Sequence, residues 1–215
     1  MPSPIGRLVS LAACLALLGL AAAGRAQAAA PASPPVQVVE KLHAALLEVM
    51  KDAEDLGYQG RYDKLAPVLK ETYDTAFMAE KSVGRHWKLA SPEDQTKLVD
   101  TFSRFMIANY AGRFDGYSGE KFEVVGEEPS AQDTVLVRTR LVQPQGEVVQ
   151  LNYRLRSANG SWKIIDVYLN GTVSELALRR SEYASLIKRE GWNAVIAALD
   201  QRIQGFATAP ADQKL

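Results

Sequence analysis

The chain has 215 residues, with 25 basic and 25 acidic side chains, 47% hydrophobic residues and a single cysteine. This length favours one domain, and the hydrophobic share is ordinary for a globular protein. Balanced charge argues against nucleic-acid binding, which usually shows a basic excess. One cysteine excludes an intramolecular disulfide framework and a thiolate cluster for zinc or iron–sulfur.

The first 28 residues have the pattern of a secretory signal peptide. Arg7 precedes an uncharged apolar run over residues 8–23, and Arg25-Ala26-Gln27-Ala28 ends in a small-x-small pattern. We predict cleavage after Ala28. The apolar run is shorter than the roughly 20 residues that span a bilayer. Two alternatives stay open, namely a retained anchor and a lipid-modified Cys14.

Behind the signal peptide, the sequence predicts a linker, one domain and a tail. Residues 29–35 are rich in Ala, Pro and Ser, and we expect them to be disordered. Residues 36–205 form the domain, and residues 206–215 form a disordered, polar tail. The chain after residue 28 contains 23 basic and 25 acidic side chains and no cysteine. Such a domain must be stabilised by its core.

Most of the domain is predicted to be helical. Apolar residues repeat at steps of three and four, which is the spacing of amphipathic helices. Gly57 and Gly60 mark a break after the first helix. Asp74 and Ser91 are suitable N-caps, and Thr172-Val173-Ser174-Glu175 has capping-box spacing. The predicted helices cover residues 36–53, 62–73, 74–84, 91–113, 172–190 and 192–203.

After Gly116 the pattern changes to strands that are rich in Val, Ile, Leu and aromatic residues. The middle pair alternates, so that Val135 and Leu155 share an apolar face while Arg138 and Arg154 share a polar one. The predicted strands cover residues 121–125, 134–142, 147–156 and 162–169. Helices before and after this twisted antiparallel sheet of about four strands make the fold class α+β.

The sequence contains no recognisable catalytic motif: GxSxG, P-loop, dinucleotide fingerprint, HExxH and CxxC patterns are all absent. Two histidines, His43 and His86, without any accompanying thiols disfavour a transition-metal site. Asp166 interrupts an apolar strand and needs a partner, either a sheet arginine or a loop amide. Its alternative role is that of a general acid or base. We therefore predict neither a cofactor nor an enzymatic activity.

One family resemblance is specific. Trp162-Lys163-Ile164-Ile165-Asp166-Val167, then Gly171-Thr172-Val173-Ser174 and Tyr183, resemble the signature of the MlaC/toluene-tolerance family. Upstream, Tyr73-Asp74 and Gly84-Arg85-His86-Trp87 agree with the same family. Its members are periplasmic phospholipid-binding components that serve an ABC lipid transporter. The similarity covers about residues 36–205.

One stretch departs from the usual family pattern. The usual family ending is an Arg-containing stretch that closes on Phe, whereas residues 174–183 of this chain contain Arg179-Arg180 and end with Tyr183. This stretch is similar to the HpnM branch, which occurs with hopanoid biosynthesis. The resemblance therefore implies either a phospholipid or a hopanoid as the ligand. It also implies a periplasmic location, transient membrane contact, and an inner-membrane ABC lipid transporter with its substrate-binding subunit as partners. No nucleic-acid partner is implied.

The resemblance implies an NTF2-like or MlaC-like fold, in which sheet and helices enclose an apolar pocket for acyl chains. A two-chain lipid with about 30 methylenes costs on the order of 25 kcal/mol to expose to water, so an enclosed pocket is needed to shield it. Periodicity and resemblance together predict that the pocket is lined by Phe77, Met78, Trp87, Phe102, Met106, Tyr110, Phe122, Val137, Leu151, Tyr153 and Val167.

Two other functions remain in competition with the lipid carrier. One is a non-catalytic adaptor of a membrane complex that docks through the Arg179-Arg180 helix. The other is an enzyme on the same fold that uses Asp166, assisted by His86. Lipid extraction, crosslinking to partners and an Asp166→Asn variant separate these hypotheses.

Overall fold

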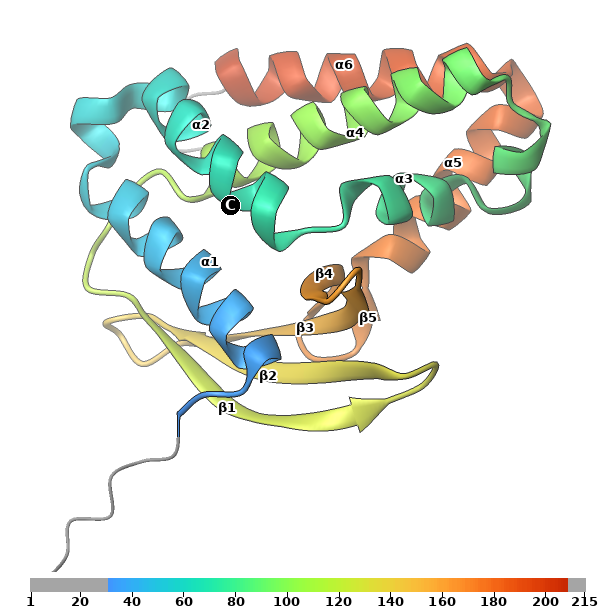
Figure 1. Ribbon diagram of the computed structural model, residues 1–215. Coiled ribbons are helices and arrows are strands. Elements are labelled where there is room, and N and C mark those ends of the chain that lie inside the picture. Colours follow the sequence, from blue (N-terminus) through green and yellow to red (C-terminus); the bar gives the residue numbers. More distant parts are fainter. Residues whose placement is uncertain (1–30, 209–215) are drawn as a thin grey trace, which may run out of the picture. The chain divides into compact units, whose positions relative to one another are not determined.

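Six α-helices, one 3-10 helix and five strands follow one another along residues 31–208, which are the residues that the computed structural model describes. The predicted signal peptide and residues 209–215 of the predicted tail lie outside these residues. Figure 1 shows the arrangement. The helices are α1 (Pro34–Lys51), α2 (Ala53–Thr72), α3 (Thr75–Val83), η1 (Gly84–Leu89), α4 (Pro92–Arg113), α5 (Glu175–Glu190) and α6 (Trp192–Thr208). The strands are β1 (Lys121–Ser130), β2 (Thr134–Val142), β3 (Val148–Ala158), β4 (Ser161–Leu169) and β5 (Val173–Ser174).

The strands form one antiparallel sheet in the order β1-β2-β3-β4-β5, and the helices lie on one of its faces (Figure 1). The predicted α+β class is therefore confirmed. In the central pair Val137 lies opposite Tyr153, and both side chains are at most 1% exposed. Arg138 and Arg140 alternate with these buried positions and are exposed. Period-two alternation places the apolar residues under the helices.

Local capping explains where two of the helices begin. The Asp74 side chain accepts a hydrogen bond from the backbone N of Phe77 at 3.1 Å at the start of α3. Ser91 does the same for the backbone N of Asp94 at 3.1 Å at the start of α4, where Pro92 occupies the first turn. Each cap satisfies an N–H group that has no partner within the helix.

The break predicted at Gly57 and Gly60 differs in the structure: α1 ends at Lys51, and Gly57 interrupts the helical path inside α2. Gly57 has a φ of +57° and a ψ of −176°, which interrupts the helical path of α2 and which residues with a Cβ rarely adopt. Gly60 lies inside α2, so the prediction that it also marks the break is wrong. The second helix begins at Ala53 instead of residue 62, because only Asp52 separates it from α1.

Pairing within the sheet corrects three other predictions. The sheet has five strands, because Val173 and Ser174 pair with Leu169 and Tyr168 of β4. This pairing moves the N-cap of α5 from Thr172 to Ser174, whose Oγ accepts from the backbone N of Ala177 at 3.0 Å. β1 extends to Ser130 because its second half also pairs with β2. At the ends, α1 starts at Pro34 and α6 continues to Thr208.

A second helical layer lies above the first. α4 packs along α6, and a Cβ on Gly112 would stand only 2.7 Å from an atom of the Phe206 ring, so the two helices approach closely at this glycine. The buried Arg61 donates to the carbonyl oxygens of Ala111 and Ala53 at 2.9 and 3.0 Å, which joins α2 to the end of α4. None of the described helices is long and apolar enough to cross a membrane.

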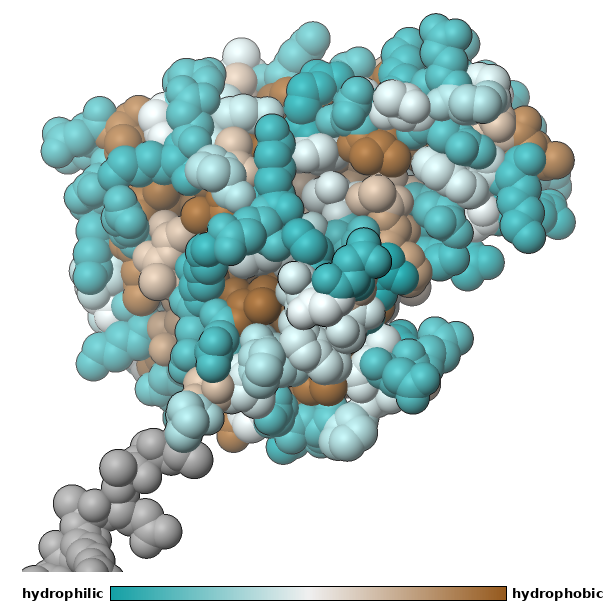
Figure 2. All heavy atoms as spheres, viewed as in Figure 1, coloured by the Kyte–Doolittle hydropathy of each residue, from teal (hydrophilic) through white to brown (hydrophobic). Residues whose placement is uncertain are grey.

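The surface seen in Figure 2 is dominated by hydrophilic residues, and hydrophobic atoms show only in small patches between them. The apolar side chains gather instead between helices and sheet. From α1, Val39, Leu42 and Leu46 are completely buried there, where they meet Leu155 and Ile164 from the sheet in the same core cluster. This core supports one end of the helical layer.

Candidate functional site

The core is not completely filled. A cavity of about 290 Å³ lies between the helix-covered face of the sheet and helices α3, α4 and α5. Its apolar and aromatic lining consists of Tyr73, Met78, Phe102, Phe105, Met106, Tyr110, Phe114, Leu141, Val149, Leu151, Tyr153, Val167, Leu169 and Leu176. Its polar lining consists of Asn109, Arg113, Gln143, Glu175 and Arg179.

The volume of the cavity limits the length of hydrocarbon chain that fits in this conformation. A water-sized group occupies about 30 Å³, so the cavity has room for about ten such groups. That space suits part of one acyl chain, whereas two full chains require the walls to move apart. Met78 and Met106 belong to the wall, and methionine side chains adapt readily to a changed cavity shape.

Most of the residues predicted to line a pocket meet at this cavity. β2, β3, β4 and the helices above them bring together residues that are far apart in the sequence. Seven of the eleven predicted residues lie in the wall: Met78, Phe102, Met106, Tyr110, Leu151, Tyr153 and Val167. Their contact with a ligand stays a prediction.

Two of the remaining four predicted residues belong to helical segments but do not line the cavity. Phe77 is next to Met78 in α3, but its ring lies 4.1 Å from the guanidinium of Arg156, outside the cavity. Trp87 is in η1, half-buried against the core, and its carbonyl oxygen accepts a hydrogen bond from Gln95 at 2.9 Å. Successive residues of a helix point about 100° apart, so only one of two neighbours can face the cavity.

The last two predicted residues lie in the filled part of the core. Phe122 stacks on the imidazole of His43, with 4.2 Å between the ring centres. Val137 is completely buried in the core cluster and does not reach the cavity wall. Both residues are on the correct face of the sheet, but α1 covers that face near them and leaves no space.

The tyrosine hydroxyl groups of the wall and the imidazole of His43 are polar but uncharged. The hydroxyl groups of Tyr73 and Tyr110 form a hydrogen bond with each other, and the Tyr153 hydroxyl lies 3.2 Å from Nε2 of His43. Burial raises the pKa of Tyr110 to about 12 and the pKa values of Tyr73 and Tyr153 well above their usual range. Burial also lowers the pKa of His43 to about 4. All four groups are therefore neutral at neutral pH.

Asp166 has a structural environment. Its Oδ1 accepts hydrogen bonds from the backbone N of Val167 at 2.8 Å and of Leu176 at 3.1 Å, and its Oδ2 accepts from Ser174 Oγ at 2.5 Å. Burial raises the pKa of this carboxyl, although these hydrogen bonds act in the opposite direction. Asp166 is absent from the cavity wall, but two of its partners, Val167 and Leu176, belong to it. It thus holds the start of α5 against β4.

Residues that sequence reasoning missed complete the wall. Leu141 and Val149 belong to the predicted apolar face and were recognisable by alternation. Asn109 and Arg113 follow Met106 on α4 at steps of three and four, but polar side chains at a helix end are typical of solvent-facing positions. Within the described part of the chain, no group of three or more His, Cys, Asp or Glu side chains could hold a metal ion.

The fold and the cavity define an α+β domain whose helices cover one face of an antiparallel sheet and leave an apolar cavity against it. The family model described as MlaC protein matches residues 40–201, and the chain belongs to this family.

Two relatives and one solved structure are similar to this chain. The intermembrane phospholipid transport system binding protein MlaC of Haemophilus influenzae is 24% identical over 129 residues, which are 58% of this chain and 60% of that protein. This chain therefore spans less than two thirds of that relative. The toluene tolerance protein ttg2D of Pseudomonas putida is 23% identical over 154 residues, 71% of this chain and 69% of that protein. The phospholipid-binding protein of Ralstonia solanacearum, solved in complex with a phospholipid, has a TM-score of 0.71 at 24% identity and covers 82% of this chain and 100% of its own.

Proposed function

We propose that this protein is a periplasmic lipid carrier that holds hydrocarbon chains in the cavity and exchanges the lipid with membranes and an ABC transporter. The observation that carries this proposal is the composition of the cavity wall. Fourteen apolar and aromatic residues surround the cavity, and their few polar groups are neutral and hydrogen-bonded to one another or to His43. A wall of this kind suits hydrocarbon better than a polar substrate.

The energetics of lipid transfer require an enclosed site. Each methylene withdrawn from water contributes about 0.8 kcal/mol, so ten methylenes in the cavity contribute about 8 kcal/mol. The remaining methylenes of a longer lipid need further shielding. We propose that the wall adapts on loading at Met78 and Met106, whose flexible side chains can change the shape of the cavity.

The similar proteins support a phospholipid as the cargo. The Haemophilus influenzae relative is named as a phospholipid transport protein, and the Ralstonia solanacearum structure contains a phospholipid. The HpnM-like stretch over residues 174–183 supports a hopanoid as the second candidate cargo. This stretch consists of Ser174 at the end of β5 and the first half of α5, and it includes three cavity residues, Glu175, Leu176 and Arg179.

We also propose that the protein is exported and non-catalytic. The pattern of residues 1–28 supports export, and the name of the Haemophilus influenzae relative supports a place in a phospholipid transport system. We propose an inner-membrane ABC transporter as the partner, as the family resemblance implies. Asp166 is the residue that an enzyme on this fold would use. Its two oxygens already accept three hydrogen bonds, which favours a structural role.

Organic extraction of the mature protein purified from its own host, followed by mass spectrometry, tests the proposal. We expect about one phosphorus-containing lipid per chain. Recovery of a neutral polycyclic lipid would assign the hopanoid as cargo instead. Protein that yields no lipid, yet crosslinks to a membrane complex through the Arg179-Arg180 face of α5, would be an adaptor and not a carrier.

A further inference from the structure

The polar residues of the cavity wall belong to three segments that meet at its edge. Asn109 and Arg113 come from the last turns of α4, Glu175 and Arg179 from the first turns of α5, and Gln143 from the turn after β2. Arg113 is the exposed residue of the lining. Tyr73 and Phe102, in contrast, are almost completely buried. The cavity therefore reaches solvent beside Arg113.

The two arginines of this edge have different electrostatic partners. The Arg179 guanidinium lies 3.6 Å from carboxylate oxygens of both Glu175 and Glu182, and 5.1 Å from the centre of the Phe105 ring. Arg113 donates from Nε to the amide oxygen of Asn109 at 3.0 Å. Within residues 31–208 it has no carboxylate partner, so its charge and its remaining N–H groups are available at the opening.

The position of Arg113 relative to the wall matches the layout of an amphiphile. Arg113 follows Tyr110 by three residues on α4, so the two side chains lie on the same face of the helix. Burial raises the pKa of the Tyr110 hydroxyl, and the charge of Arg113 acts in the opposite direction. Tyr110 in turn bonds to Tyr73 in the interior. A ligand whose chain enters between these tyrosines and Leu151 would thus place its polar end near Arg113.

We propose that Arg113 binds the phosphate of the lipid headgroup and is the residue by which this cavity prefers phosphate-bearing lipids to neutral ones. A guanidinium offers planar, paired N–H donors that match phosphate oxygens, and it stays charged at all physiological pH values. A neutral lipid gains nothing from this residue. The inference rests on the proposed lipid-carrier function.

Two single-chain probes that share one acyl group isolate the phosphate. Palmitoyl lysophosphatidic acid and palmitoylglycerol both carry one sixteen-carbon chain on a glycerol, and the first differs from the second only by its phosphate. Their dissociation constants are measured by calorimetry with delipidated mature protein. For Arg113→Gln we expect about tenfold weaker binding of the lysophospholipid, the order of loss of a charged hydrogen bond, and binding of palmitoylglycerol within twofold of wild type.

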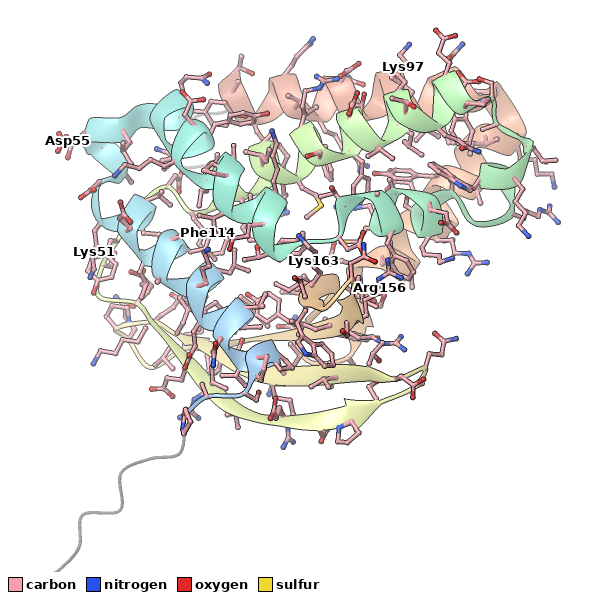
Figure 3. The ribbon with its side chains drawn as sticks, in the orientation of Figure 1. Lys51, Asp55, Lys97, Phe114, Arg156 and Lys163 are labelled. Carbon is pink, nitrogen blue, oxygen red and sulfur yellow. The ribbon has the colours of Figure 1, made fainter. Side chains whose placement is uncertain are left out.

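Lys97→Gln is the matched control, because it removes one positive charge from the same helix. Lys97 is 16 residues from Arg113, about 24 Å along the helix, and Figure 3 shows it at the end of α4 opposite to Phe114. This variant should bind both probes as wild type does. Arg113→Lys should recover part of the loss, since it keeps the charge but not the planar donors. Added salt should weaken lysophospholipid binding by wild type more than by Arg113→Gln.

Other outcomes overturn the proposal in distinguishable ways. Equal effects of Arg113→Gln on both probes, or no effect on either, would show that Arg113 does not recognise phosphate. Inorganic phosphate that binds wild type as tightly as the lysophospholipid, and fails to bind Arg113→Gln, would make the residue a free-anion site and not a headgroup site. Wild-type protein that binds neither probe would contradict the lipid-carrier function itself.

Discussion

Arg156 of β3 donates two hydrogen bonds to the same carboxylate oxygen of Asp74, from Nε at 3.0 Å and from Nη2 at 2.6 Å. The other oxygen of Asp74 caps α3 through the backbone N of Phe77, whose ring lies below the Arg156 guanidinium. The Asp74 backbone N also donates to the carbonyl oxygen of Ile164 at 2.9 Å. This contact attaches the start of α3, and with it Met78 in the cavity wall, to the sheet (Figure 3 labels Arg156).

Replacing Arg156 by Gln should lower the free energy of unfolding by about 1–2 kcal/mol, because two charged hydrogen bonds and a cation–π contact are lost. Urea unfolding of the purified protein measures this change. Arg140→Gln is the matched control. Arg140 is an exposed arginine on β2 with one ion pair to Glu123, and its loss should change the free energy by less than about 1 kcal/mol. Equal effects of the two variants would contradict a special role for Arg156.

Removing the Asp166 carboxyl group should lower the free energy of unfolding more than replacing it with an uncharged amide. Asp166→Ala leaves the backbone N of Leu176 and the Ser174 hydroxyl without their acceptor, and should lower the free energy of unfolding by about 2–3 kcal/mol. Asp166→Asn keeps one acceptor oxygen and should lower it by about 1 kcal/mol or less. If Asp166→Asn unfolded the protein while Asp166→Ala did not, the hydrogen-bonding account would be wrong.

His43 makes the stability depend on pH. Its pKa is about 4 in the folded protein and 6.5 in the reference state, so between these values the unfolded chain binds a proton that the folded chain does not. The free energy of unfolding should therefore fall as the pH decreases from 7 to 4, by at most about 3 kcal/mol from this group. Urea unfolding at several pH values in this range measures this dependence. The free energy of unfolding should change less with pH for His43→Gln than for wild type.

Substitution of the other histidine, His86→Gln, is the control for this experiment, because His86 lies in η1 and not beside Phe122 and Tyr153. Identical slopes for wild type and His43→Gln would show that burial of His43 does not govern the pH dependence.

Filling the cavity should displace lipid without much loss of stability. Val167→Phe places an aromatic ring into the space of about 290 Å³ next to Leu151 and Met106. We expect the amount of lipid extracted per chain to fall at least twofold, while the free energy of unfolding changes by about 1 kcal/mol or less, because the ring enters empty space. Val125→Phe is the control, since Val125 is 58% exposed on β1. Unchanged lipid content in Val167→Phe would argue against this cavity as the binding site.

Local features of the sequence were sufficient to predict much of the fold. The caps at Asp74 and Ser91 depend on residues within one helical turn, and the alternation in β2 depends on side-chain period alone. The shift of the α5 cap from Thr172 to Ser174 was not predictable in this way. It results from hydrogen bonds between β5 and β4, which only the assembled sheet provides.

The sequence predicts which positions are apolar, but it does not predict which of these positions line the cavity. Phe77 and Met78 are adjacent and both apolar, and their periodicity does not say which one faces the sheet. In the structure the Phe77 ring packs against the guanidinium of Arg156 and Met78 lines the cavity. Phe122 and Val137 lie on the correct face but under α1, and hydropathy does not distinguish a filled core from a hollow one. The sequence does not predict Arg113 as a residue of the cavity wall, because a charged residue at a helix end usually faces water.

The most direct test of a lipid-holding cavity is photocrosslinking with a phospholipid that carries a diazirine near the end of one acyl chain. After irradiation of the loaded mature protein, peptide mass spectrometry locates the attachment sites. The proposed function predicts crosslinks to interior wall residues such as Met106, Leu151 and Val167, and their loss in Val167→Phe. Crosslinks confined to exposed apolar residues such as Leu89 or Val125 would contradict it, because they would place the lipid chain on the surface.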